Sequence, residues 1–317
     1  MIEFLKKIRW ANLTIIIFTM YAMRFLVVKQ LLLYNGLLLQ LNEWYFLMLV
    51  LATVFIAIGG YIINDYFDKK IDALNNPIKK EGETDDEETF CCRKALQFYN
   101  LFTISGVVLG VGVSLLINQY MFGGIFLLVA GLLWFYSSTY KRIPLLGNLI
   151  VAFLSALVPL LVVIFEVPLL INKYRTIFIE NNTNPFTIMY FVMGFAFFAF
   201  MLTLIREIVK DIEDVIGDKA YGKKTLAVAF GNGFATVTAG VLVVATIYFL
   251  FYFQTHFSNE KVSFWYIIIL LISPLSYVVY RLIANTTKQG MHITSMILKL
   301  IMFFGIAYSI VLYYGLK

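Results

Sequence analysis

Charged residues are scarce in this sequence, which excludes an ordinary water-soluble domain. Only 14% of the 317 residues are Asp, Glu, Lys or Arg, whereas 61% are hydrophobic and the mean hydropathy is +0.84. Soluble domains carry about a quarter charged residues and less than half apolar ones. A core surrounded by water cannot hide so much apolar surface, so the composition predicts a polytopic membrane protein.

Cysteine and histidine are also rare. The two cysteines, Cys91 and Cys92, are adjacent and lack the spacing of metal ligands, and neither His256 nor His292 has a partner at such a spacing. A small-residue cleavage site after a short apolar stretch is missing from the first residues, MIEFLKKIRWANL. We therefore expect no removable signal peptide, and the first apolar run stays in the protein as a span.

Long apolar runs dominate what remains. Each approaches the ~20 residues that a helix needs to cross a ~30 Å hydrocarbon layer. A helix also satisfies its own backbone hydrogen bonds in lipid. The predicted fold is all-α, a polytopic bundle of about nine transmembrane helices in one domain, 1–317. The spans are expected at 11–34, 44–63, 95–116, 120–139, 145–165, 187–208, 234–253, 264–283 and 293–314.

Lysine and arginine are distributed unevenly between the two sides of such a bundle. The N-terminal tail and the loops after the second, fourth, sixth and eighth spans carry 18 of the 25, the opposite side carries four, and three lie within spans. The positive-inside rule predicts a multi-pass protein of the cell membrane whose N-terminus and Asp-rich loops are cytoplasmic. The pI of about 9.1 then reflects a basic face against anionic lipid and not a nucleic-acid binder.

Two triplets of aspartate share one spacing and follow even-numbered spans. NDYFDKKID (64–72) follows the second span, and KDIEDVIGDKAYGKK (210–224) follows the sixth. Each aspartate of the first triplet lies 146 residues before its counterpart in the second. Four intervening spans restore the chain direction, so the sequence predicts two parallel pseudo-repeats whose acids face one central cavity. The triplets are Asp65, Asp68 and Asp72, and Asp211, Asp214 and Asp218.

The spacing of these acids predicts a metal–phosphate site. Residues at i, i+3 and i+7 lie along one face of a helix. Six carboxylates repel one another unless cations lie between them, and Mg²⁺ commonly binds one or two carboxylates together with substrate phosphates. We expect two Mg²⁺ ions, with Asn64 adding a neutral oxygen. Arg206 and Lys210 are expected to contact phosphate oxygens near the second triplet.

A diphosphate bound where an apolar bundle meets water suggests an isoprenyl diphosphate as the donor. Its charged head would be held by Mg²⁺ while its hydrocarbon tail lies between apolar helices. Allylic diphosphates react by ionisation to a delocalised carbocation, and metal ions stabilise the negative charge that develops on the departing diphosphate.

Both motifs resemble those of the UbiA-type intramembrane prenyltransferases. NDYFDKKID matches that family's N-D-x-x-D-x-x-x-D motif, and DVIGD (214–218) matches its D-x-x-x-D motif. Residues 205–231 look like its second signature region, and 136–153 are similar to its segment between the fourth and fifth helices. The resemblance implies a helical bundle around a central cavity, in which Mg²⁺ holds a prenyl diphosphate for transfer to a nucleophilic acceptor.

The resemblance also implies roles for individual residues. Asn64 and the first triplet would bind one Mg²⁺, and the second triplet would bind the other. Lys141, Tyr136 and Tyr140 occupy the family's tyrosine–lysine region and would contact the diphosphate or shield the cation. The two tyrosines are equally well interpreted as aromatics of the membrane interface. Arg24, inside the first span, is expected to approach the substrate head group.

One departure from the family pattern follows the first motif. Many relatives continue into N-R-P, whereas this chain has Asn75-Asn76-Pro77. The missing arginine removes one expected diphosphate contact. Lys79 or Lys80 would replace it.

Alternatives from other classes remain open at this point. CDP-alcohol phosphotransferases keep their acids in one short stretch with a glycine soon after the first pair, whereas Lys69 follows Asp68 here. A transporter would favour broken helices and a site near the midplane. The acceptor is expected to be hydrophobic or amphiphilic. The second motif favours a geranylgeranylglyceryl phosphate-like ether-lipid precursor, and the alternative is an aromatic quinone precursor such as 4-hydroxybenzoate or dihydroxynaphthoate.

Overall fold

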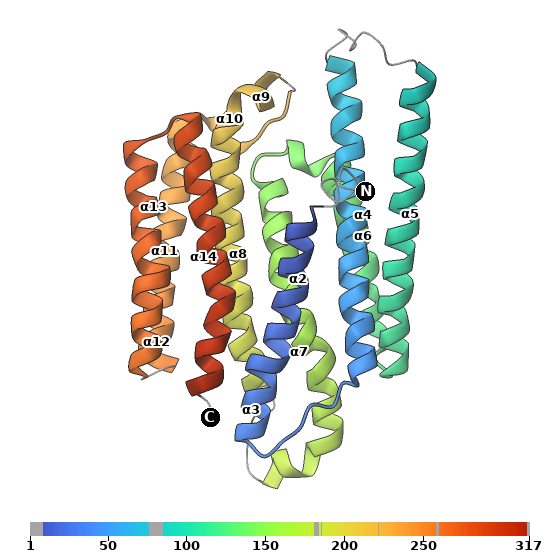
Figure 1. Cartoon of the computed structure of the whole chain (residues 1–317), viewed down its shortest axis with the longest axis vertical. Helices are drawn as coiled ribbons and strands as arrows, with labels where there is room; N and C mark the ends of the chain where they lie inside the picture. Colours follow the sequence, from blue (N-terminus) through green and yellow to red (C-terminus); the bar gives the residue numbers. More distant parts are fainter. Residues whose placement is uncertain are drawn as a thin grey trace. The chain divides into compact units, whose positions relative to one another are not determined.

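The computed structural model describes residues 9–75, 85–180, 184, 186–220, 222–257 and 260–315, without the side chains of 69–75, 85–92, 180 and 257. Within these ranges the chain is helical and has no strand (Figure 1). The elements in chain order are α2 (Trp10–Ala22), η1 (Met23–Val28), α3 (Lys29–Tyr34), α4 (Glu43–Asn75), α5 (Asp85–Leu116), η2 (Tyr120–Phe122), α6 (Gly123–Ser138), η3 (Tyr140–Arg142), α7 (Leu146–Glu180), α8 (Thr187–Glu213), α9 (Val215–Ala220), α10 (Leu226–Phe230), α11 (Asn232–Phe257), α12 (Lys261–Tyr266), η4 (Ile267–Ile272), α13 (Ser273–Ala284) and α14 (Lys288–Gly315).

Nine helical stretches of the described chain are long and apolar enough to cross a membrane. They coincide with the nine runs expected from the sequence, including the closely spaced third and fourth, at Arg93–Leu116 and Tyr120–Ser138. The all-α fold and the nine spans are therefore confirmed. The central cavity stays a prediction.

The chain divides into two compact units. The first comprises Met1–Phe18 and Leu41–Lys141, in which α4, α5 and α6 pack against one another. Small residues allow transmembrane helices to approach closely. A Cβ on Gly106 of α5 would lie 2.9 Å from the carbonyl oxygen of Ala52 in α4, so only glycine fits at this contact.

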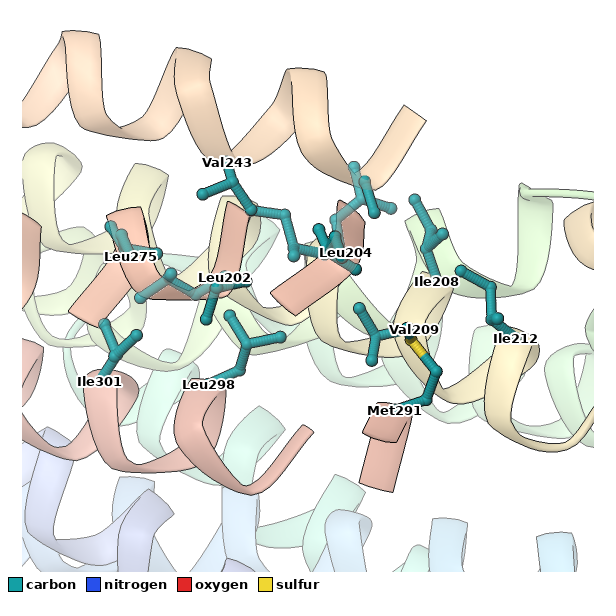
Figure 2. Packing of buried hydrophobic residues seen from close by; sticks show 14 of the residues in the cluster. Leu202, Leu204, Ile208, Val209, Ile212, Val243, Leu275, Met291, Leu298 and Ile301 are labelled. Atoms are coloured by element: carbon teal, nitrogen blue, oxygen red, sulfur yellow. The ribbon is translucent and has the colours of Figure 1, made fainter. Parts of the chain in front are cut away.

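The second unit comprises Thr19–Gln40 and Arg142–Lys317. Its helix α8 packs against α7, α11 and α14, and its buried residues form one hydrophobic cluster. Figure 2 shows Leu202 of α8 beside Leu298 of α14, and Val209 of α8 beside Met291 of α14. The residue number rises along one helix as it falls along the other, so these two helices run antiparallel.

Helix length positions the first aspartate triplet. Helix α4 has 33 residues, about 50 Å at 1.5 Å per residue, which exceeds the ~30 Å hydrocarbon layer. Asn64 comes 21 residues after Glu43, or about 32 Å along the axis. The acids therefore begin where the apolar part of the helix ends, and one continuous helix carries all three.

The second triplet does not lie on one continuous helix, which corrects the expectation of a single acidic face. Helix α8 ends at Glu213, Asp214 has φ −97° and ψ 7°, and α9 begins at Val215. The interruption is slight, because the Asp218 N–H still donates to the Asp214 carbonyl at 2.9 Å. Asp211 and Asp218 consequently belong to two different helices.

Candidate functional site

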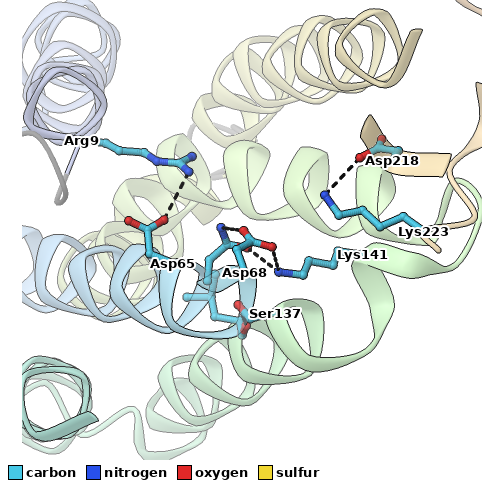
Figure 3. A network of polar contacts seen from close by, with 9 residues as sticks. Arg9, Asp65, Asp68, Ser137, Lys141, Asp218 and Lys223 are labelled. Atoms are coloured by element: carbon cyan, nitrogen blue, oxygen red, sulfur yellow. Dashed lines mark hydrogen bonds and ion pairs between the residues drawn. The ribbon is translucent and has the colours of Figure 1, made fainter. Parts of the chain in front are cut away.

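The first triplet is organised around the ammonium group of Lys141. Lys141 Nζ lies 2.6 Å from Asp68 Oδ1 and 3.4 Å from Asn64 Oδ1, and the Asn64 amide donates to Asp68 Oδ2 at 2.9 Å. The lysine side chain is only 7% exposed. Figure 3 shows its amine directed at the Asp68 carboxylate. Asn64, Asp68 and Lys141 thus come together, and the oxygens of the first two converge on the ammonium group of the third.

Asp65 points to a different partner. Its Oδ1 lies 3.7 Å from Nη2 of Arg9 (Figure 3), and the Arg9 guanidinium also lies over the Tyr61 ring, 5.2 Å from the centroid. Both ends of the ion pair are substantially exposed, so the pair contributes little to stability. A polyanion that attracts Arg9 would release Asp65 at small cost.

Aromatic side chains fix the helix that carries these acids. Phe67 of α4 makes an edge contact with Trp134 of α6 at 5.5 Å between ring centroids, and Tyr99 of α5 reaches the same tryptophan at 5.4 Å. Such pairs add roughly 0.5–1.5 kcal/mol beyond the area that they bury. The backbone between Asn64 and Asp68 is thereby held against two neighbouring helices.

The tyrosines of the predicted tyrosine–lysine region lie close to Lys141 in the chain. Tyr136 is half-buried near the end of α6, and the Tyr140 ring packs against Phe135 at 5.9 Å. Their proposed substrate contacts stay predictions. The side chain of Asp72, and Lys79 and Lys80, lie outside the described residues.

The second triplet has its own polar partners. The Asn148 amide, at the start of α7, donates to Asp211 Oδ2 at 2.7 Å. Asp218 is 7% exposed, and Lys223 Nζ lies 3.1 Å from its Oδ1 (Figure 3). Asp211 and Asp218 are within electrostatic range of each other, whereas Asp214 is exposed. The sequence alone does not single out Asn148 as a functional residue. Its only distinguishing feature there is an amide side chain at the start of an apolar run.

Arg206 and Lys210 lie on the last two turns of α8. Arg206 Nη1 forms a salt bridge with Glu207 Oε1 at 2.7 Å, and no salt bridge of the described residues joins it to Asp211 or Asp214. Lys210 lies within electrostatic range of Asp211. Both cations are therefore placed beside the second triplet.

Arg24 is not placed beside the acids of its own unit. It lies in η1, where its Nη1 is 3.3 Å from Glu166 Oε2 and both side chains are 1% exposed. Glu166 comes 18 residues after Asn148 in α7, roughly 27 Å along a regular helix. Because Asn148 marks the position of Asp211, this geometry argues against Arg24 as a contact of the substrate head group.

The donor chemistry of each triplet fits a hard divalent cation. No three carboxylate, cysteine or histidine side chains of the described residues converge closely enough to hold a metal ion by themselves. Mg²⁺ does not need such a cage, because it usually takes one or two carboxylates plus water and substrate phosphate. Asp68 and the Asn64 carbonyl already converge on a cation, the Lys141 ammonium.

Comparison with known proteins decides the family. Residues 25–307 match the model of the UbiA prenyltransferase family. The chain belongs to the UbiA prenyltransferase family. It is 32% identical to digeranylgeranylglyceryl phosphate synthase of Methanosphaera stadtmanae over 252 residues, 78% of this chain and 80% of the relative. It is 30% identical to the synthase of the same name from Thermococcus gammatolerans over 265 residues, 81% and 83% of the two chains.

Solved structures agree with the fold of this UbiA chain. A structure described as giving insights into digeranylgeranylglyceryl phosphate synthase in membranes has a TM-score of 0.66 at 23% identity, covering 98% of each chain. A UbiA homolog from Archaeoglobus fulgidus bound to DMAPP and Mg²⁺ has a TM-score of 0.53 at 16% identity, covering 97% of this chain and 99% of that one. The prenyltransferase interpretation is confirmed, and the transporter and CDP-alcohol phosphotransferase interpretations are set aside.

Proposed function

We propose that this UbiA prenyltransferase moves a polyprenyl group from an isoprenyl diphosphate to a geranylgeranylglyceryl phosphate-like ether-lipid precursor. The names of the relatives that cover about four-fifths of the chain support this acceptor. The DMAPP- and Mg²⁺-bound homolog supports the donor class and the metal. The observation that carries the site assignment is the convergence of Asp68 and Asn64 oxygens on the Lys141 ammonium.

The residues of the first unit would bind and orient the diphosphate. Bound Mg²⁺ would supply positive charge that stabilises the departing diphosphate. Asp65, Asp68 and Asp72 would contribute carboxylate oxygens, and Asn64 would contribute its carbonyl. Lys141 would move from its salt bridge with Asp68 to a phosphate oxygen, since an ammonium group forms charge-assisted hydrogen bonds with both carboxylate and phosphate.

The residues of the second unit would perform the same task with a second ion. Asp211 is held by Asn148 and Asp218 by Lys223, so both carboxylates are oriented before the substrate arrives. Preorganised charges of this kind stabilise a transition state without reorganising during the reaction. Asp214, exposed between the two helices, is the most accessible oxygen donor of the triplet.

The reaction itself would break the bond between the allylic carbon and the diphosphate oxygen. The prenyl cation would then be captured by a hydroxyl oxygen of the acceptor, whose proton is lost, and diphosphate is released. The apolar spans would keep water from the cation, since water would compete as a nucleophile.

A single incubation tests donor, metal and acceptor together. Purified protein in detergent would receive Mg²⁺, geranylgeranyl diphosphate and either geranylgeranylglyceryl phosphate, 4-hydroxybenzoate or dihydroxynaphthoate, with products identified by mass spectrometry. We expect an EDTA-sensitive prenylated ether lipid. Prenylation of an aromatic acid, without any reaction of the glyceryl phosphate, would show that the acceptor is a quinone precursor and not an ether lipid.

The cytoplasmic placement of the aspartate triplets is also proposed here, on the uneven distribution of lysine and arginine. Single cysteines at Thr286, before α14, and at Lys261, at the start of α12, would be introduced after replacing Cys91 and Cys92. A membrane-impermeant maleimide added to intact cells should label the cysteine at 261 and leave the one at 286 unlabelled until the cells are opened. The reverse pattern would invert the topology.

A further inference from the structure

Helices α8 and α14 of the second unit place two cations opposite each other. Their register is fixed by a hydrogen bond between His292 Nδ1 of α14 and Glu213 Oε1 of α8, 2.8 Å long. Arg206 lies seven residues before Glu213, and Lys299 lies seven residues after His292. Seven residues are about two helical turns, which returns each side chain to the same face of its helix.

Because α8 and α14 run antiparallel, both steps lead about 10 Å in the same direction from the Glu213–His292 contact, which brings Arg206 and Lys299 near each other. Leu202 and Leu298, close to these cations along the two helices, both belong to the apolar cluster (Figure 2). Lys299 is within electrostatic range of both Arg206 and Lys210. Lys210 follows Arg206 by one turn, so three cations lie near one another.

The carboxylates near the three cations already have partners. Glu207 is bonded to Arg206, Glu213 to His292, and Asp211 to Asn148. No carboxylate of the described residues lies within salt-bridge distance of Lys210 or Lys299, and Nε of Arg206 is buried without a hydrogen-bond partner among them. Positive charge so near the hydrocarbon layer is costly unless an anion or water compensates it.

We infer that Arg206, Lys210 and Lys299 form a subsite for the phosphate monoester of an amphiphilic acceptor, distinct from the aspartate triplets that serve the diphosphate donor. A phosphate monoester carries a charge between −1 and −2 near pH 7 and offers three acceptor oxygens, which matches three neighbouring cations. This subsite extends the proposed function and rests on it, because the proposed function identifies the lipid that bears the phosphate.

The position of Lys299 suits a lipid phosphate. Lys299 follows Lys288, the first residue of α14, by 11 residues, about 16 Å along the axis. Its side chain is exposed, and Leu298 and Ile301 on the neighbouring positions are buried in the apolar cluster. Met296, Leu300 and Phe303 of the same helix are exposed, so a phosphate bound here would lie beside apolar helix surface able to receive a hydrocarbon chain.

Binding without turnover tests the subsite independently of catalysis. The detergent-purified full chain would be titrated calorimetrically, in EDTA and without donor, with a geranylgeranyl glycerol ether carrying a terminal phosphate and with the same ether ending in an alcohol. The variants are Lys299→Met, Lys299→Arg and the control Lys288→Met, which removes a lysine of the same helix from its first turn.

Lys299→Met should weaken binding of the phosphate by about tenfold or more, the effect expected when one charged hydrogen bond is lost. Binding of the alcohol should not change, Lys299→Arg should retain most of the affinity, and Lys288→Met should match the unmodified protein. In turnover assays the KM for the acceptor should rise while the KM for the donor stays constant.

Three outcomes would overturn the inference: equal phosphate affinity in Lys299→Met and the unmodified protein, equal loss for phosphate and alcohol, or a loss confined to binding of geranylgeranyl diphosphate with Mg²⁺. If only an aromatic acid is prenylated in turnover, the proposed acceptor fails, while the phosphate titration still reports on the subsite by itself.

Discussion

Lys141 Nζ lies 2.6 Å from Asp68 Oδ1, and the lysine is 7% exposed while the Asp68 side chain is 38% exposed. The buried partner is the cation, and the exposed partner is the carboxylate. An incoming Mg²⁺–diphosphate complex would therefore meet Asp68 first and find the ammonium group already in place behind it. This arrangement makes separate predictions for the two residues.

Asp68→Asn should reduce prenyl transfer by at least about a hundredfold, because it removes a metal-binding charge while retaining side-chain shape. Product formation under saturating Mg²⁺ and donor is the measurement. Glu43→Gln, at the other end of α4, is the matched control and should remain active. Transfer within threefold of the unmodified protein in Asp68→Asn would remove Asp68 from the metal site.

Lys141→Met should raise the KM for the isoprenyl diphosphate and lower kcat, because the ammonium would bind the diphosphate both in the ground state and as it departs. One charged contact to phosphate is expected to contribute about 1.5–3 kcal/mol, or roughly ten- to a hundredfold in kcat/KM. Lys141→Arg should recover part of the loss. An unchanged kcat/KM in Lys141→Met would mean that the lysine only neutralises Asp68.

Asn148→Leu should raise the Mg²⁺ concentration that gives half-maximal activity. Asn148 is a positioning residue, since its amide holds Asp211 Oδ2 at 2.7 Å and makes no proposed contact with substrate. Losing an outer partner of a metal ligand typically costs ten- to a hundredfold in metal affinity. A Mg²⁺ titration of activity measures the shift. Loss of kcat at saturating Mg²⁺ with no change in the titration midpoint would contradict this role.

The spans were predictable because their signal is local. A helix that crosses lipid must be long and apolar, and each of the nine runs meets that condition without reference to any other part of the chain. The same holds for the proximity of Asn64 and Asp68, which lie one turn apart on α4. The contact of Lys141 with Asp68 was not predicted, because spacing alone does not indicate which loop returns to which helix; the family resemblance implied only that Lys141 contacts the diphosphate or shields the cation.

The remaining features depend on tertiary contacts. No proline near Asp214 indicates that the helix ends there, and Asn148 bonds to Asp211, which is 63 residues away in the chain. Arg24 was assigned to the substrate because a charge inside a span usually faces a cavity or a partner. Its partner is Glu166, 142 residues away, and only the packing of η1 against α7 brings the two together.

The Arg24–Glu166 pair should matter for stability, because losing one member leaves the charge of the other buried without a partner. Both side chains are 1% exposed, and Glu166 also accepts a hydrogen bond from the backbone N–H of Gln40. Removing one member of such a pair leaves an uncompensated buried charge and costs about 3–5 kcal/mol. Arg24→Met and Glu166→Gln should therefore each lower the unfolding temperature in detergent.

The double variant should be no less stable than the less stable single variant, because its second change removes a charge already left without its partner. Additive losses in this double-mutant cycle would show that the two side chains stabilise the fold independently.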